Sequence, residues 1–297
     1  MLEQLRKISE IPCVNGGERS FSSFLENYFK QKSFAVQRLP GNHILVRKSD
    51  LKPNTVLFTP MDSPGFVCLY REDGIAYLSP TSKALDDIKD FDSVINNEGV
   101  FFKLEETKYD KSTFCVKNDQ IRLGESLSVS STVSVVDSVI TGRFASKYAC
   151  VAMLMKLAEL ITNPDVAICF TAGFHSGAKA ESNVLKRIGA NNAILLNFAD
   201  VGDSLQMPIL AIKDGKHFSS DVLSNAFSES CSENGFPLRK IVFDKAISAA
   251  ERIYAPHVRE VLSLALPCSN LYSDREKVFA IDAMLQALTH FFNTNKF

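Results

Sequence analysis

Apolar positions along this chain follow a helical period in some stretches and a strand period in others. The apolar runs at 43–48 and 55–59 predict two strands, and the second, bounded by Pro53 and Pro60, is typical of a buried central strand. A helix before them is indicated by apolar residues that recur at intervals of three and four. These residues are Phe21, Phe24, Leu25, Tyr28 and Phe29.

The pattern changes between about residues 66 and 139. Short alternating segments are separated there by Gly, Asn, Asp and Ser, without a long helical pattern, which predicts a small all-β domain. After Gly142, helix and strand patterns alternate to the end of the chain, which favours a three-layer α/β sheet. The predicted helices span 146–161, 178–188, 219–233 and 276–292, and the predicted strands span 166–170, 193–197, 208–213, 238–243 and 260–266.

Because the β segment interrupts the α/β pattern, the sequence predicts two domains. Residues 1–65 and 141–297 would form a mixed-sheet α/β domain, and residues 66–140 an inserted, barrel-like β domain.

Composition narrows the class of protein. Lys plus Arg is 33 and Asp plus Glu is 34, so the net charge is -1 and a nucleic-acid partner is not expected. No window reaches the roughly 20 apolar residues that a membrane-spanning helix needs. The seven cysteines include no CxxC pair, which predicts a reduced, cytoplasmic protein without a cysteine-type zinc site.

The sequence contains no HExxH, P-loop, GxGxxG or GxSxG motif, and the SxxK match at 49–52 lies in a predicted polar loop. Four polar residues nevertheless follow or end predicted strands: Asp62, His175, Asn197 and Tyr272. Ligand sites of open α/β sheets form at the carboxyl ends of strands, so this placement predicts a cleft there.

Longer segments around these strand ends carry a family resemblance. In chain order they are LRKISEIPCVNGGE, RLPGNHILVRK, TPMDSPGFV, ITGRFASKYACVAML, CFTAGFHSGAKA, GFPLRK and LPCSNLYSDREKV. Their order and spacing resemble the co-catalytic zinc metallopeptidases that include glutamyl, deblocking and tetrahedral (TET) aminopeptidases and the cellulase-M-like proteins. The resemblance runs along essentially the whole chain.

The resemblance implies a zinc-aminopeptidase-type α/β domain with an inserted β domain, two zinc ions, homo-oligomers and removal of N-terminal residues from peptides. It also implies a role for particular positions. The two metal-binding His positions are Pro60 and Tyr272, the bridging Asp is Ser146 with Lys147 beside it, the general-base Glu is Phe174, and two further carboxylate ligands are His175 and Asn197. Asp62, which orients the first His in the family, is retained.

These replacements predict the loss of the metal pair. Two dications roughly 3.5–4 Å apart need anionic ligands to offset their repulsion. Ser146, His175 and Asn197 stand where carboxylates would, and Lys147 adds a positive charge. We therefore expect no metal cofactor, with zinc or cobalt only if the family activity is retained, and we expect Lys147 to pair with Asp62.

Three functional hypotheses follow. The favoured one is a non-catalytic homologue that binds a peptide or small ligand in the cleft, or assembles with an active relative. The second is a hydrolase that uses His175 with Ser176 or Asp62, without metal or with one metal ion. The third is an ordinary aminopeptidase whose ligands lie elsewhere, for which the acidic candidates are Asp200, Asp203, Asp244, Asp274 and Glu276.

Overall fold

The computed structural model describes residues 1–82, 85, 93–106, 114–175, 177, 179–202, 206–253, 255–269 and 274–295, without the side chains of 274–276. Within these ranges the main feature is a nine-stranded mixed sheet, ordered β1-β2-β13-β3-β14-β18-β15-β16 with β17 beside β15. Its strands are β1 (Ala35–Leu39), β2 (His43–Arg47), β3 (Thr55–Pro60), β13 (Val166–Thr171), β14 (Asn192–Asp200), β15 (Ile209–Asp214), β16 (His217–Phe218), β17 (Arg239–Phe243) and β18 (Glu260–Cys268).

The four central strands of this sheet, β13, β3, β14 and β18, run parallel to one another, whereas β2 and β15 pair antiparallel on either side. Because the central strands are buried on both faces, their sequences are apolar throughout rather than alternating. Their carboxyl ends therefore meet at one edge of the sheet, as the sequence predicted.

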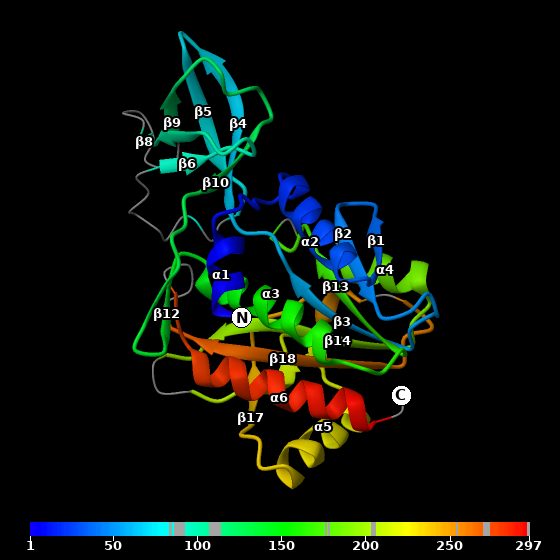
Figure 1. The fold of residues 1–297 in the computed structure, drawn as a ribbon. Helices are drawn as coiled ribbons and strands as arrows, with labels where there is room; N and C mark the ends of the chain where they lie inside the picture. Colours follow the sequence, from blue (N-terminus) through cyan, green and yellow to red (C-terminus); the bar gives the residue numbers. More distant parts are fainter. Residues whose placement is uncertain are drawn as a thin grey trace.

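Helices cover both faces of the sheet and make it a three-layer structure (Figure 1). In β3, Leu57 belongs to the larger core, which includes residues of α1, α2, α3, α5 and α6, whereas Val56 and Phe58 pack on the opposite face with α4. The helices are α1 (Leu2–Ser9), α2 (Arg19–Gln31), α3 (Ala145–Leu160), α4 (Ala180–Ile188), α5 (Asp221–Glu233) and α6 (Val278–Thr294), with a short 3-10 turn η2 (Ala250–Arg252).

A second sheet is inserted between β3 and α3 and forms the upper lobe in Figure 1. The described residues give it seven strands in the order β7-β6-β10-β4-β5-β9-β8. They are β4 (Gly65–Glu72), β5 (Ile75–Pro80), β6 (Ser93–Ile95), β7 (Phe101–Lys103), β8 (Glu105–Glu106), β9 (Phe114–Lys117) and β10 (Ser126–Val129). The predicted fold class, a mixed α/β sheet with an inserted all-β domain, is thus confirmed.

A three-stranded sheet links the end of this insertion to the C-terminal part of the chain. It is formed by β11 (Ser134–Val136), β12 (Val139–Gly142) and β19 (Asp274–Lys277). The sequence analysis missed this sheet and placed the start of the last helix where β19 lies. The domain limits at 65/66 and 140/141 stay a prediction.

The predicted helices and strands of the α/β part all have counterparts in the structure, with ends that differ by a few residues. Helix α1 and strand β1 are further elements that the sequence pattern did not predict. In the described part of the chain, no helix is both long enough and apolar enough to cross a membrane.

Candidate functional site

The edge where the parallel strands end gathers most of the positions that the resemblance singled out. Pro60 ends β3 opposite Thr171 at the end of β13, so the segments that carry Asp62 and His175 start side by side. Asn197 lies in β14, and its main-chain carbonyl accepts a hydrogen bond from Cys150 Sγ of α3 (3.5 Å). Tyr272 and Ser176 lie outside the described residues.

Asp62 is fully buried, and its carboxylate is held by main-chain groups. Oδ1 accepts a hydrogen bond from the N–H of Phe174 (3.1 Å) and Oδ2 one from the N–H of His175 (3.2 Å). Burial raises the pKa of Asp62, while these two N–H groups and the Lys147 ammonium act in the opposite direction. Asp62 therefore fixes the turn that follows β13, and both its oxygens are engaged there.

Lys147 is buried in the first turn of α3, with a relative exposure of 2%. Its ammonium lies 3.6 Å from the centroid of the Tyr148 ring and 5.5 Å from that of Phe21, distances typical of cation–π contacts. The ion pairs found among the described residues do not include one between Lys147 and Asp62. The Lys147 ammonium nevertheless interacts electrostatically with Asp62, because it acts to lower the pKa of that carboxyl. A direct contact between the two side chains stays a prediction.

The His175 side chain is partly buried, and two positively charged side chains affect its pKa. Burial, followed by the Lys147 ammonium and the Arg252 guanidinium, lowers the pKa of His175 to about 3. The imidazole is consequently neutral at physiological pH. Its ring packs edge-on against that of Phe174, with centroids 5.3 Å apart.

Arg252 is a site residue that the sequence analysis missed. Its guanidinium donates a hydrogen bond to the carbonyl of Phe174 (3.1 Å) and lies 5.4 Å from the centroid of the Phe174 ring. Arg252 ends η2, far along the chain from the turn it contacts, and no spacing in the sequence links the two. The position that the resemblance assigns to the general base therefore holds an aromatic ring, Phe174, with the Arg252 guanidinium against it.

A buried aspartate holds the loop that precedes Arg252. Asp214 Oδ1 accepts a hydrogen bond from the N–H of Ile247 (2.6 Å), and the hydroxyl of Ser248 also donates to the Asp214 carboxylate. The side chain of Asn197 reaches the same loop, because its Nδ2 donates to the carbonyl of Ile247 (2.6 Å). Its Oδ1 accepts from the N–H of Phe198 (3.0 Å), so the amide of Asn197 is used at both ends.

Two further buried carboxylates lie close enough to Asp62 to affect one another's pKa. Glu181 on α4 accepts a hydrogen bond from the hydroxyl of Thr171 (2.8 Å), and Glu18 accepts one from the N–H of Gly16 (2.8 Å). Burial raises the pKa of each, and the negative charge of Asp62 raises it further. The sequence analysis missed both, because neither residue's burial is visible from local pattern.

The residues described at these positions form no cluster of metal-ligating side chains. Across the ranges that the structure describes, no three His, Cys, Asp or Glu side chains are grouped so that they could hold a metal ion. Of the acidic residues considered for an alternative ligand set, Asp244 is exposed and pairs with Lys213, and Asp200 is exposed at the end of β14. Asp203 and the side chains of Asp274 and Glu276 lie outside the described residues.

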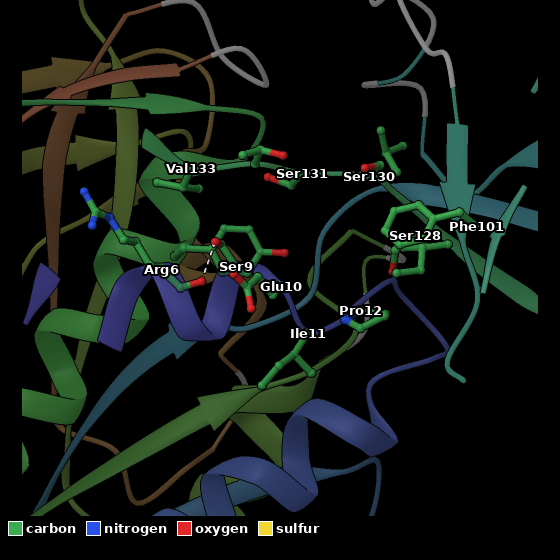
Figure 2. Close-up of a pocket in the computed structure, with 14 residues that line it drawn as sticks. Arg6, Ser9, Glu10, Ile11, Pro12, Phe101, Ser128, Ser130, Ser131 and Val133 are labelled. Atoms are coloured by element: carbon green, nitrogen blue, oxygen red, sulfur yellow. Dashed lines mark hydrogen bonds between the residues drawn. The ribbon is translucent and has the colours of Figure 1, made fainter. Parts of the chain in front are cut away.

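A separate pocket of about 300 Å³ lies between the end of α1 and the chain that leaves β10 (Figure 2). Residues 9–12 form one wall, residues 128–133 the other, and Tyr148 and Phe101 also line it. We call it the α1 pocket. It shares no residue with the positions predicted from the resemblance, and the sequence analysis did not anticipate it.

Comparison with known proteins rests on structure alone. No protein-family model matches the sequence, and no curated protein matches it either. Solved structures do match. An aminopeptidase from the archaeon Desulfurococcus kamchatkensis superposes with a TM-score of 0.85 at 12% identity, covering 99% of this chain and 94% of that one.

Two further structures extend this match. A TET aminopeptidase from a marine-sediment Thaumarchaeota archaeon has a TM-score of 0.85 at 13% identity, with 99% and 96% of the two chains covered. The TET peptidase of Pyrococcus horikoshii, which assembles into a tetrahedron or a large octahedral shell, has a TM-score of 0.78 at 11% identity, with 99% of each chain covered.

Such identities establish the fold, and the match covers nearly the whole length of each chain. The resemblance inferred from the sequence is confirmed at that level: this chain has the fold of the TET aminopeptidases.

Proposed function

We propose that this protein keeps the zinc-aminopeptidase fold without its paired zinc ions and without peptidase activity. The former catalytic cleft would then serve as a rigid scaffold that binds a peptide or small ligand or supports assembly.

The observation that carries the proposal is the charge of the cleft. Lys147 is a buried cation in the first turn of α3, and Arg252 is a second cation hydrogen-bonded to the main chain beside His175. A site that already disfavours one proton on His175 disfavours two dications far more strongly, because the Coulomb repulsion grows with charge. The one retained family carboxylate, Asp62, is committed to two main-chain N–H groups.

The same geometry argues against hydrolysis by other means. Phe174 cannot accept a proton. His175 has a pKa of about 3, far below the operating pH of an effective general base. Asp62 contacts the main chain of His175 rather than orienting its ring, as a catalytic carboxylate would.

The direct test is to purify the full chain with added zinc or cobalt, measure metal by mass spectrometry, and assay hydrolysis of a panel of aminoacyl-p-nitroanilides. We expect far less than one metal ion per chain and no turnover above buffer. An active zinc aminopeptidase in the same assay is the control for the conditions. One or two tightly bound ions per chain together with turnover would overturn the proposal.

A rebuilt variant sharpens this test. It carries Pro60→His, Ser146→Asp, Lys147→Asp, Phe174→Glu, His175→Glu, Asn197→Asp and Tyr272→His. If the lost ligands alone exclude the metal, the folded variant should bind zinc where the native chain does not. Its folding is checked by circular dichroism before metal is measured.

We also propose that the chain forms a homo-oligomer in the cytoplasm. The assembly of the structurally similar Pyrococcus horikoshii peptidase supports the first part. The seven cysteines, all in described positions, are free thiols, which supports a reducing compartment. Light scattering after size exclusion would reveal the subunit number, and a monomer at micromolar concentration would contradict the first part.

A further inference from the structure

We propose that a pocket between the β1–β2 hairpin and helix α4 is a binding site for a phosphate group. The pocket has a volume of about 310 Å³, and we call it the α4 pocket. It is lined by Leu39, Pro40 and His43 of the hairpin and by Asn183, Val184, Lys186 and Arg187 of α4. It shares no residue with the α1 pocket or with the positions of the former cleft, so the proposal does not depend on the function proposed above.

His43 contributes a buried hydrogen-bond donor to this pocket. Its side chain is 7% exposed, and its Nδ1 accepts a hydrogen bond from the N–H of Ala172 (3.1 Å). Because a ring nitrogen that accepts carries no proton, the proton of the imidazole is on Nε2. Burial lowers the pKa of His43, which favours this neutral form.

The Nε2–H group of His43 opens into the pocket. Nε2 has no hydrogen-bond partner in the described part of the chain, yet it keeps some accessible surface. A Cβ on Gly41 would lie 2.9 Å from Nε2, so the glycine in the hairpin turn leaves one side of this donor open. Buried polar groups nearly always have a partner, and the partner of Nε2 has to come from the pocket.

Two cations and an amide approach the same space from α4. Asn183, Lys186 and Arg187 lie at intervals of three and four residues and therefore share one face of the helix. The ion pairs among the described residues include neither cation, and the described lining contains no acidic side chain. Both cations also complement the dipole at the carboxyl end of α4, but that effect does not account for the open donor on His43.

The lining favours a phosphate group over other anions. His43 Nε2, Lys186 and Arg187 can only donate hydrogen bonds, and the last two bring two positive charges. A phosphate monoester carries roughly -1.5 to -2 charges and three strong acceptor oxygens at neutral pH, whereas a carboxylate carries one charge and two oxygens. The pocket volume lies at the lower end of the range for ligand sites, which suits a small phosphorylated molecule.

Calorimetric titration of the full chain tests the ligand class. The probes are phenyl phosphate, inorganic phosphate and phenylacetate, at about 0.15 M ionic strength to screen unspecific attraction. A chelator in the buffer prevents phosphate from binding through adventitious metal. We expect saturable binding of phenyl phosphate to one site, and binding of phenylacetate at least about tenfold weaker, because it offers less charge and fewer acceptors.

The inorganic phosphate titration distinguishes the two sources of a phosphate group. Tighter binding of phenyl phosphate identifies an ester as the ligand, whereas equal affinity identifies free phosphate, and either result supports the site. No saturable binding of either phosphate at millimolar concentration would overturn the proposal, as would phenylacetate binding as tightly as phenyl phosphate.

Nuclear magnetic resonance locates the site. In the full chain labelled with ¹⁵N-histidine, phenyl phosphate should shift the Nε2 signal of His43, which is assigned by its loss in His43→Asn. The amide oxygen of that variant can still accept from Ala172, but the Nε2 donor is lost, so the affinity should fall about tenfold. An unchanged Nε2 signal at saturating phenyl phosphate would place the ligand elsewhere and overturn the proposal.

Variants on α4 complete the test without altering a buried residue. Arg187→Met should weaken phenyl phosphate binding at least about tenfold, because it removes a charge-assisted hydrogen bond. Lys52→Met is the matched control: it removes an exposed cation beside Gly189, at the end of the same helix but outside the pocket, and should change the affinity less than about twofold. Equal losses in the two variants would show a diffuse charge effect and overturn the proposal. Circular dichroism checks that each variant is folded, and Arg187→Met decides if His43→Asn is not.

Discussion

Lys147 is a buried cation on helix α3, where the other buried residues are mostly apolar or small. Of the residues of α3, those from Ala145 to Met155 are all buried, so the ammonium loses most of its hydration. Such a charge is tolerated only where nearby groups compensate it. The Asp62 carboxylate is one such group, because the ammonium acts to lower its pKa.

A double-mutant cycle measures this interaction. Lys147→Met should lower the free energy of unfolding by about 2 kcal/mol at pH 7, because it leaves Asp62 less compensated. In an Asp62→Asn background the same change should cost at least about 1 kcal/mol less. Urea denaturation gives both values, and Lys186→Met, on the exposed face of α4, is the control. Strictly additive effects would show that the two charges do not interact.

His175 makes stability depend on pH. Its pKa is about 3 in the folded protein and about 6.5 in the unfolded chain, so the unfolded state binds an extra proton between these values. The stability contributed by the neutral imidazole is present above pH 6.5 and is lost as the pH falls. When the pH falls from 8 to 5, the free energy of unfolding of His175→Gln should therefore rise by about 2 kcal/mol relative to that of the native chain, as measured by urea denaturation.

The native chain's own pH profile also contains opposing groups. The raised pKa values of Glu18, Asp62 and Glu181 mean that these carboxyls favour the folded state at low pH and lose that contribution as the pH rises through their folded values. Only the difference between native and variant profiles isolates His175. If the stabilities of the native chain and the variant changed in parallel with pH, the pKa of the His175 imidazole would not be lowered in the folded protein.

At the scale of elements, the chain makes a close approach at the junction between β3 and the inserted sheet. Gly65 begins β4 just after the bridge between Val14 and Ser63. A Cβ there would lie 2.2 Å from Cγ2 of Val14 and 2.5 Å from the carbonyl oxygen of Leu127. Because Gly65 has no Cβ, the chain can leave the central sheet between Val14 and Leu127, which are both buried.

Replacing this glycine tests the junction. Gly65→Ala should destabilise the protein by about 3 kcal/mol, because the Leu127 carbonyl belongs to a paired strand and cannot move freely. Gly74→Ala is the matched control: its φ is +76° but nothing lies within 4 Å, so it should cost only about 1 kcal/mol of backbone strain. Thermal unfolding of both variants gives the comparison, and equal costs would contradict the steric explanation.

At the scale of the whole molecule, the sequence predicts those elements whose burial leaves a recognisable local pattern of apolar residues. The apolar runs of β3 and β13 and the largely apolar sequence of α3 are recognisable because burial on both faces leaves few polar positions. The change to short alternating segments likewise reveals the inserted sheet. The family resemblance then orders these elements into one fold.

What the sequence does not reveal depends on contacts between distant segments. β19 reads DREK, a charged stretch typical of a helix start, and is a strand only because β12 pairs with it. The roles of Glu18, Glu181 and Arg252 arise from burial and from neighbours more than 50 residues away or on other elements. No local spacing encodes them.

Zinc should have no effect on global stability. A ligand that binds the folded state at 100 times its dissociation constant adds about 2.7 kcal/mol, which would raise the midpoint of thermal unfolding by several degrees. We expect the midpoint to be unchanged by excess zinc or by a strong chelator, because the buried Lys147 ammonium and the Arg252 guanidinium beside Phe174 would repel a further cation. A rise with zinc that a chelator reverses would contradict this.

The pairing of β12 with β19 also bears on how the protein is made. Chains leave the ribosome N-terminus first, at roughly 5–20 residues per second. The insertion and β12 emerge long before β19, which pairs with β12 from more than 130 positions downstream and completes the three-stranded sheet. The lobe at the top of Figure 1 is therefore anchored at its return point only near the end of synthesis. Until then, the exposed edge of β12 is open to capture by a chaperone or by another nascent chain.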